Sequence, residues 1–142
     1  RKFYRKVFKN SKDGLVVHYP ADSKPHKEAA VMYSDFMLED AWFSAMDGPG
    51  THDFAFNEAV SFVISCKDQK EVDYFWESLS KGGNKSQCGW LKDKFGVSWQ
   101  IVPQEMASLM TKDSETSERV MKAMFKMQKL DIQKLKDSYN SK

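Results

Sequence analysis

The sequence of 142 residues predicts an α+β fold made of two related βαβββ modules followed by helices. Helix-like and strand-like patterns occur in the same order in both halves, which is typical of an internal repeat. A shift of 71 residues aligns Phe3-Tyr4 with Tyr74-Phe75, and Phe8 with Leu79. The segment after Pro103 contains neither proline nor glycine, which favours helices there.

The first module is predicted to occupy residues 1–50. Apolar residues on one face and basic residues on the other indicate a short helix over 2–9, and turn-forming residues end it: Asn10, Ser11, Asp13 and Gly14. The remaining segments are a strand over 15–19, a loop over 20–27, strands over 29–38 and 41–46, and an exposed loop over 48–57.

The second module is predicted to occupy residues 57–103. A buried strand over 59–66 opens it, and Asp68 then begins a helix as its N-cap, with Glu71 in an approximate capping box. One apolar helix face follows, and glycines end the helix: Val72, Phe75, Trp76, Leu79, then Gly82-Gly83. Strands are expected over 87–92 and 97–102, on either side of a turn.

The first module has no strand ahead of its helix. We therefore expect that its first strand is absent from this chain, and that Arg1 lies inside the first helix of a longer protein. Residues 104–142 form a predicted helical extension that packs on the 1–103 domain or on a partner subunit. Its helices are expected over 104–111, 114–128 and 131–139, with Asp113 and Asp131 as N-caps.

Composition excludes several function classes. A formal net charge of +2 with mixed signs argues against a nucleic-acid partner, and no apolar run approaches the roughly 18 residues of a membrane span. Two cysteines, Cys66 and Cys88, imply no disulfide framework, and we expect a cytoplasmic protein. No glycine-rich phosphate loop, dinucleotide fingerprint or nucleophile elbow is present, so no nucleotide cofactor is expected.

The histidines and the methionines form no pattern that is specific for metal binding or for docking of a partner. The three histidines lack the spacing of metal ligands: His18, His26 and His52. Five methionines recur at near-helical spacing, which indicates either packing of helices on the sheet or a docking surface for a partner: Met106, Met110, Met121, Met124 and Met127.

Residues 88–103 read Cys-Gly-Trp-Leu-Lys-Asp-Lys-Phe-Gly-Val-Ser-Trp-Gln-Ile-Val-Pro. This segment resembles the strand–turn–strand of the glyoxalase/bleomycin-resistance (vicinal oxygen chelate) superfamily, where the turn reads D-P-F-G and a tryptophan follows. More narrowly, the chain is similar to the PhnB-like branch, often labelled demethylubiquinone methyltransferase-like, at Phe3–Lys12, 57–66, 71–82 and 119–130. The resemblance implies paired βαβββ modules whose mixed sheet curls around a cavity.

The resemblance also implies where metal ligands would lie. Metal-dependent members take ligands from their first, fourth, fifth and eighth strands. In this chain the fourth-strand position falls at Ser44 or Met46, the fifth near Ala59 and the eighth at Gln100. One amide and no histidine cannot hold a divalent cation tightly, so no metal or other cofactor is expected.

Strand alternation then gives the expected cavity lining. Trp99 and Ile101 are predicted to face the helix. The cavity-lining candidates are Ser44, Met46, Ala59, Ser61, Ser98 and Gln100. No catalytic residue is assigned.

The function expected from this set is metal-free binding or sequestering of a small molecule by a cytoplasmic homodimer. Two alternatives remain open: a metal-dependent lyase or dioxygenase of the same superfamily, and a structural or regulatory dimer.

Overall fold

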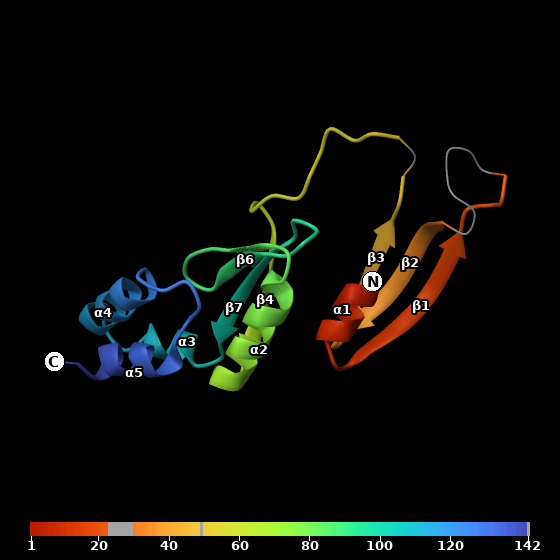
Figure 1. Cartoon of the computed structure of the whole chain (residues 1–142). Coiled ribbons are helices and arrows are strands. Elements are labelled where there is room, and N and C mark those ends of the chain that lie inside the picture. The colour runs from red at the N-terminus through yellow and green to blue at the C-terminus, as the bar shows by residue number, and fades with distance from the viewer. Residues whose placement is uncertain (23–29, 49, 142) are drawn as a thin grey trace. The chain divides into compact units, whose positions relative to one another are not determined.

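A computed structural model describes residues 1–22, 30–48 and 50–141 (Figure 1). The chain divides into two compact units, Arg1–Asp53 and Phe54–Lys142. Each unit is considered by itself below.

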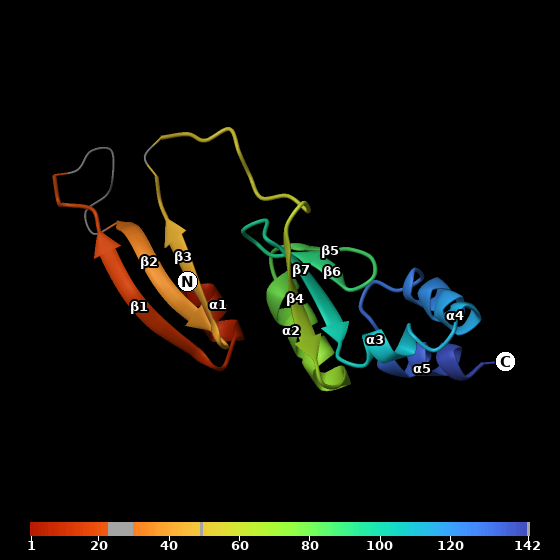
Figure 2. The same cartoon turned by 180° about the vertical axis from the view of Figure 1, so that it is seen from behind.

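The described residues of the first unit form one helix and an antiparallel sheet with the strand order β1-β2-β3. Its elements are α1 (Lys2–Val7), β1 (Ser11–His18), β2 (Val31–Leu38) and β3 (Ala41–Met46). The α1 helix covers one face of the sheet, where Tyr4 stacks on Phe36 and Phe36 stacks on Phe43 (Figures 1 and 2). Apolar burial on this face therefore fixes which side of each strand points inward.

Two predicted boundaries in the first unit are wrong. The helix ends at Val7 rather than at residue 9, and β1 begins at Ser11 rather than at residue 15. The residues expected to form a turn pair with the end of β2 instead, Ser11 with Leu38 and Asp13 with Phe36. Pairing with β2 overrides the preference of these residues for a turn. The pairing is still irregular, because its register breaks after Asp13.

The second unit begins with a mixed sheet that has the strand order β4-β7-β6-β5, with α2 packed on one face (Figures 1 and 2). Its elements are β4 (Ser61–Cys66), α2 (Gln69–Ser80), β5 (Asn84–Lys85), β6 (Trp90–Lys92) and β7 (Ser98–Pro103). β4 runs parallel to β7, and the other neighbours are antiparallel. This arrangement is a complete βαβββ module, as the sequence predicts.

Register divides the residues of the second sheet between its two faces. Trp99 and Ile101 are buried on the α2 side, as predicted, together with Leu91 of β6. Buried residues of α2 complete this core: Val72, Trp76 and Leu79. The opposite face carries the intervening residues of β7, which are considered below.

Two strand predictions in the second unit need correction. β4 begins at Ser61 rather than at residue 59, because the Asn57 side chain accepts from the Ala59 backbone N–H and forms a turn before the strand. The strand predicted over 87–92 is shorter than expected, since only β6 (Trp90–Lys92) lies in it, and β5 (Asn84–Lys85) was not predicted. Cys88 and Gly89 both adopt positive φ angles, of 58° and 82°, which a continuous strand does not allow.

The turn between β6 and β7 is organised by a buried carboxylate. One oxygen of Asp93 accepts from the backbone N–H groups of Phe95 and Val97, and the other accepts from the indole N–H of Trp99 at 2.9 Å. Hydrogen bonds satisfy both oxygens, which is what the burial of a charged group requires. Asp93 thereby fixes the position of Trp99 in the core.

The C-terminal extension has a small core of its own. Its helices are α3 (Met106–Leu109), α4 (Ser114–Met124) and α5 (Ile132–Asn140). Four buried residues form this core: Leu109, Val120, Leu130 and Leu135. Four of the five spaced methionines pack against it, so they join helix to helix rather than helix to sheet as expected: Met106, Met110, Met124 and Met127.

The extension is also tied to the sheet within the same chain. Gln69 of α2 donates to the Leu130 carbonyl and accepts from the backbone N–H of Ile132, the first residue of α5. Cys88 and Gly89 donate from their backbones to the carbonyls of Met127 and Gln128. The division into domains 1–103 and 104–142, and packing of the extension on a partner subunit, stay predictions.

All three predicted aspartate N-caps are confirmed. Asp68, Asp113 and Asp131 accept from backbone N–H groups three residues ahead, at 2.9, 2.7 and 3.1 Å. Among the described residues, no helix has the length and apolar character needed to cross a membrane.

Candidate functional site

The candidate residues of the second unit lie on the sheet face opposite α2. Ser61 pairs with Ser98 across β4 and β7, and the Gln100 side-chain amide donates to the Ser61 hydroxyl at 2.9 Å. The structure thus brings Ser61, Ser98 and Gln100 together on one face. Ala59 precedes β4 in an exposed turn, so its predicted place on the strand is wrong.

The candidate residues of the first unit lie on the sheet face opposite α1. Ser44 and Met46 of β3 pair with Asp35 and Tyr33 of β2. The Ser44 hydroxyl donates to the Asp35 carboxylate at 2.8 Å, and the Tyr33 hydroxyl also donates to that carboxylate. The result is a small polar cluster around one half-buried acidic side chain.

Trp42 stands on the same face as this cluster and is 60% exposed. A Cβ atom added at Gly14 would lie 2.8 Å from the Trp42 ring and 2.7 Å from the Asp35 Cβ atom. Glycine is therefore required here, because any side chain would displace both residues. The ring rests on the β1 backbone and keeps much of its surface open.

Tyr33 and Asp35 were missed as candidates in the sequence. Strand alternation over 31–38 places both on one face, and pairing with 41–46 would place Ser44 opposite Asp35. The missing information was the register between the two strands, which the turn at Glu39 fixes with a positive φ of 51°. Strand alternation alone could have predicted that Tyr33 and Asp35 share a face, but not which residues of 41–46 they contact.

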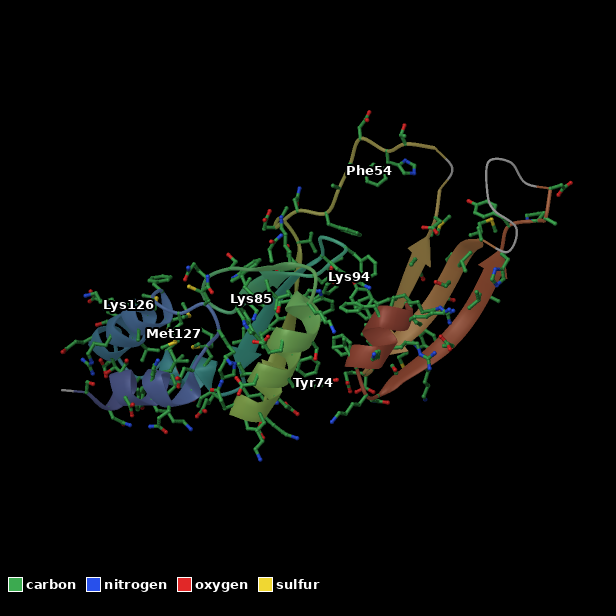
Figure 3. The ribbon with its side chains drawn as sticks, viewed as in Figure 1. Phe54, Tyr74, Lys85, Lys94, Lys126 and Met127 are labelled. Atoms are coloured by element: carbon green, nitrogen blue, oxygen red, sulfur yellow. The ribbon has the colours of Figure 1, made fainter. Side chains whose placement is uncertain are left out.

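A pocket of about 770 Å³ lies in the second unit. Neither Ser61 nor Gln100 lines it, but Ser98, which pairs with Ser61 across β4 and β7, does. Its lining comes from β5, β6, β7, the segments before β4 and β6, and the end of α4: Glu58, Asn84, Lys85, Ser86, Gln87, Cys88, Trp90, Leu91, Lys92, Ser98, Met124 and Phe125. Ser98 is the predicted candidate that lines it. In Figure 3, Lys85 marks the β5 side of the pocket and Met127 marks the chain just beyond α4.

Ser98 also differs from the other candidates because it is buried without a hydrogen-bond partner. It is 1% exposed, and its hydroxyl has no hydrogen-bond partner in the structure. Buried hydroxyls are normally paired, because losing water without gaining a partner is unfavourable. Ser98 therefore belongs to the pocket wall with a hydroxyl that is buried and unpaired.

Metal-binding side chains do not converge in the described residues. No group of three or more histidine, cysteine, aspartate or glutamate side chains there is arranged to hold an ion. His26 lies outside the described residues. Cys66 and Cys88 are free thiols, one buried and one half-buried. Burial, followed by the negative charges of Glu71 and Asp68, raises the pKa of the Cys66 thiol to about 12.

Comparison with known proteins agrees with this architecture. Residues 1–102 match the family described as 3-demethylubiquinone-9 3-methyltransferase. The chain belongs to this family. Membership confirms the predicted PhnB-like branch of the glyoxalase-like fold and the α+β class. The match ends before the C-terminal helices.

Several solved structures are similar to the chain, and two of them are compared here with it. The PhnB protein from Bacillus cereus is 29% identical with a TM-score of 0.66, over 72% of this chain and 86% of that one. The Pseudomonas aeruginosa protein PA1353 is 15% identical with a TM-score of 0.59, over 72% of this chain and 85% of that one, and it shows the fold alone. No curated protein is significantly similar to the chain.

Proposed function

We propose that this family member binds a small molecule, without a metal ion, on the face of the second sheet opposite α2. The observation that carries the proposal is the hydrogen bond between Gln100 and Ser61, at 2.9 Å. Both groups are neutral, and Ser61 pairs across the sheet with Ser98, which lines the pocket. A neutral amide–hydroxyl pair favours hydrogen bonding to a ligand over coordination of a divalent cation, which prefers carboxylates and imidazoles.

The pair retains capacity for a ligand. An amide has two N–H donors and a carbonyl that accepts twice, and the bond to Ser61 uses one of these donors. A bound molecule can therefore both donate to Gln100 and accept from it. Methyl transfer, which the family description names, needs a methyl donor. The sequence has no glycine-rich nucleotide loop for such a donor, which favours binding over transfer.

The test uses the side-chain amide of Gln100 as its reporter. Small neutral heterocycles are added to ¹⁵N-labelled full-length protein, and the Gln100 side-chain signal is followed by NMR. We expect saturable shifts of this signal and of backbone signals in β4 and β7. Gln100→Leu should abolish the backbone shifts, and the exposed control Gln104→Leu should leave them unchanged. The proposal fails if binding heterocycles shift only signals remote from β4 and β7.

Metal-dependent lyase or dioxygenase activity is a second candidate, which the Asp35 cluster favours. The Asp35 carboxylate is an oxygen ligand that hard cations accept, and the hydroxyls of Tyr33 and Ser44 adjoin it. Elemental analysis of the purified protein separates the candidates. Stoichiometric iron, zinc or manganese that is lost in Asp35→Asn supports this second candidate and overturns the metal-independent proposal.

A third candidate is a structural or regulatory dimer, and we propose a homodimer as the state in solution. β3 lies at the edge of the first sheet, and within the described residues no strand pairs with its outer side. Unpaired strand edges favour association with another chain. Light scattering across a dilution series should give twice the chain mass, and a monomer at every concentration would refute the homodimer.

A cytoplasmic location is also proposed. Both cysteines are free thiols, which suits a reducing compartment. Fractionation of cells that produce the full-length protein tests the location, and recovery from an oxidising compartment would contradict it.

A further inference from the structure

We propose that the face of the first sheet opposite α1 binds a small organic ammonium ion, with Asp35 as its counter-ion and Trp42 as its aromatic platform. The site lies within the first unit, so the inference goes beyond the binding proposed for the second sheet and does not depend on it. Three observations on the described residues carry it: a carboxylate oxygen that accepts no hydrogen bond, a carboxylate that has no cationic partner, and an exposed indole ring beside them.

The Asp35 carboxylate is held in place through one of its two oxygens. The hydroxyls of Tyr33 and Ser44 both donate to Oδ1, and these hydroxyls lie 3.1 Å from each other. In the part of the chain that the structure describes, no group donates to Oδ2. The buried polar side-chain atoms without a partner there are Arg5 Nε and Ser98 Oγ, so Oδ2 is open to solvent. A ligand N–H can therefore donate to an oxygen whose position is already fixed.

The negative charge of Asp35 is not compensated within its own unit. Among the described residues, no lysine, arginine or histidine forms an ion pair with it, whereas Asp13 pairs with both Arg1 and Arg5. Lys12 lies on the same face of the sheet as Asp35, but its side chain is exposed and forms no ion pair. A cation bound at Oδ2 would supply the opposite charge at close range, where the Coulomb attraction is largest.

The indole ring of Trp42 adjoins this carboxylate. Trp42 belongs to β3, yet its Cζ3 atom lies 2.8 Å from the position of a Cβ atom added at Gly14 of β1, and the Asp35 Cβ atom lies 2.7 Å from the same position. The ring therefore crosses β2 and lies next to the Asp35 side chain. Trp42 is 60% exposed, which leaves ring surface open to a ligand. Tryptophan is the aromatic side chain that attracts cations best, because of the quadrupole of its ring.

The neighbours of Asp35 on β3 define the rest of the ligand. Trp42 and Met46 flank Ser44 on the same face, and Met46 is 72% exposed. An apolar group attached to the ammonium nitrogen can cover these side chains while an N–H group donates to Oδ2. The ligand class that fits is therefore a protonated primary amine with an apolar body.

The experiment uses benzylammonium as the probe and benzyl alcohol as its neutral analogue. Each is titrated at pH 7 into the ¹⁵N-labelled full-length protein, and NMR follows the backbone signals of 33–35 and 42–46 and the indole N–H signal of Trp42. We expect saturable shifts with benzylammonium and binding of the alcohol that is at least about fivefold weaker, because the cation–π contact and the charge-assisted hydrogen bond both need the positive charge. Equal affinities for the two compounds would overturn the inference.

Matched variants locate the site. Asp35→Asn keeps the shape of the side chain and an oxygen for the two hydroxyls but removes the charge, so it should weaken benzylammonium binding several-fold. Trp42→Leu removes the ring and should also weaken it. The control Asp40→Asn changes an exposed aspartate of the β2–β3 turn and should bind the probe as the wild type does. If either Asp35→Asn or Trp42→Leu binds benzylammonium as tightly as the wild type, the inference is overturned.

Two other occupants of this face are outcomes of the same experiment. If Mn²⁺ broadens the signals of 33–35 and benzylammonium does not shift them, Asp35 holds a hard metal cation and the inference is overturned. If N-acetyl-lysinamide binds as tightly as benzylammonium, the cation is a lysine of another protein rather than a small molecule, which also overturns it. Neither outcome affects the binding proposed at Gln100, because that binding is followed on β4 and β7.

Discussion

The carboxylate of Asp93 illustrates how one residue can hold a turn and part of the core. It is 2% exposed and accepts from two backbone N–H groups and from the Trp99 indole. We predict that Asp93→Leu lowers the free energy of unfolding by about 3 kcal/mol, because buried donors lose a charged acceptor. Urea denaturation measures the change.

The control for this prediction is Asp40→Ala, which replaces an exposed aspartate of the β2–β3 turn. Surface changes of this kind usually alter the unfolding free energy by less than about 0.5 kcal/mol. A loss below about 1 kcal/mol for Asp93→Leu would mean that water or a rearranged turn satisfies the donors.

The two cysteines should differ in reactivity. The thiolate is the reactive form, and the pKa of Cys66 is raised to about 12 by burial, so this residue stays a thiol at pH 8. We predict that iodoacetamide labels the half-buried Cys88 first, and that Cys66 reacts only as the protein unfolds. Peptide mass spectrometry checks the order, and equal labelling of both residues in folded protein would contradict it.

The raised pKa of Cys66 also predicts the direction in which the unfolding free energy changes at alkaline pH. The folded state keeps the Cys66 proton that the unfolded chain loses near its ordinary value of 9.0. Stability from this group is therefore present below pH 9 and declines as pH rises towards 12. Cys66→Ala should remove this contribution, so its unfolding free energy should fall less between pH 9 and pH 11 than that of the wild type.

Among the elements, α2 begins as the sequence predicts, with one difference. Asp68 accepts from the Glu71 backbone N–H, but Glu71 reaches back to the backbone N–H of Lys67 rather than to that of Asp68. The hydrogen bond from the Lys67 backbone N–H, together with the Lys67 ammonium, lowers the pKa of the Glu71 carboxyl, although burial opposes this change. Two residues that precede the helix, Lys67 and Asp68, therefore form the hydrogen bonds of this cap.

We predict that Asp68→Ala destabilises the protein by about 1 kcal/mol through loss of this N-cap. Asp68→Asn is the matched control, because an amide oxygen can still accept from the Glu71 N–H. Thermal unfolding monitored by circular dichroism measures both variants. Equal melting temperatures for the alanine and asparagine variants would show that the cap contributes nothing.

Helices and caps were more predictable than strands for a physical reason. A helix depends on neighbours three and four residues apart, so its apolar face and its cap lie within one short segment. A strand depends on a partner that is distant in the sequence. A strand was therefore predicted over 87–92, whereas Cys88 and Gly89 donate hydrogen bonds to the segment after α4, and the strand begins only at Trp90.

At the scale of the second unit, Gln69 links elements that lie far apart in the sequence. Its amide donates to the Leu130 carbonyl and to Asp73, and accepts from the Ile132 N–H. We predict that Gln69→Ala destabilises the protein by about 1 to 2 kcal/mol and speeds hydrogen exchange at 130–135.

The comparison variant is Gln133→Ala, which removes an exposed bond within α5. It should leave hydrogen exchange in α2 and β6 unchanged. If Gln69→Ala leaves hydrogen exchange at 130–135 unchanged, the extension is held by its apolar contacts and not by this link.

The sequence by itself determined the α+β class, the order of the helices and strands apart from β5, the three N-caps and the faces on which Ser98, Trp99, Gln100 and Ile101 lie. These follow from periodicity and local hydrogen bonding. Only the tertiary structure decided that Gln100 meets Ser61, that Ser44 meets Asp35 and that the Ser98 hydroxyl has no partner. The reason is that strand register, and the cavities left by packing, depend on residues distant in the chain.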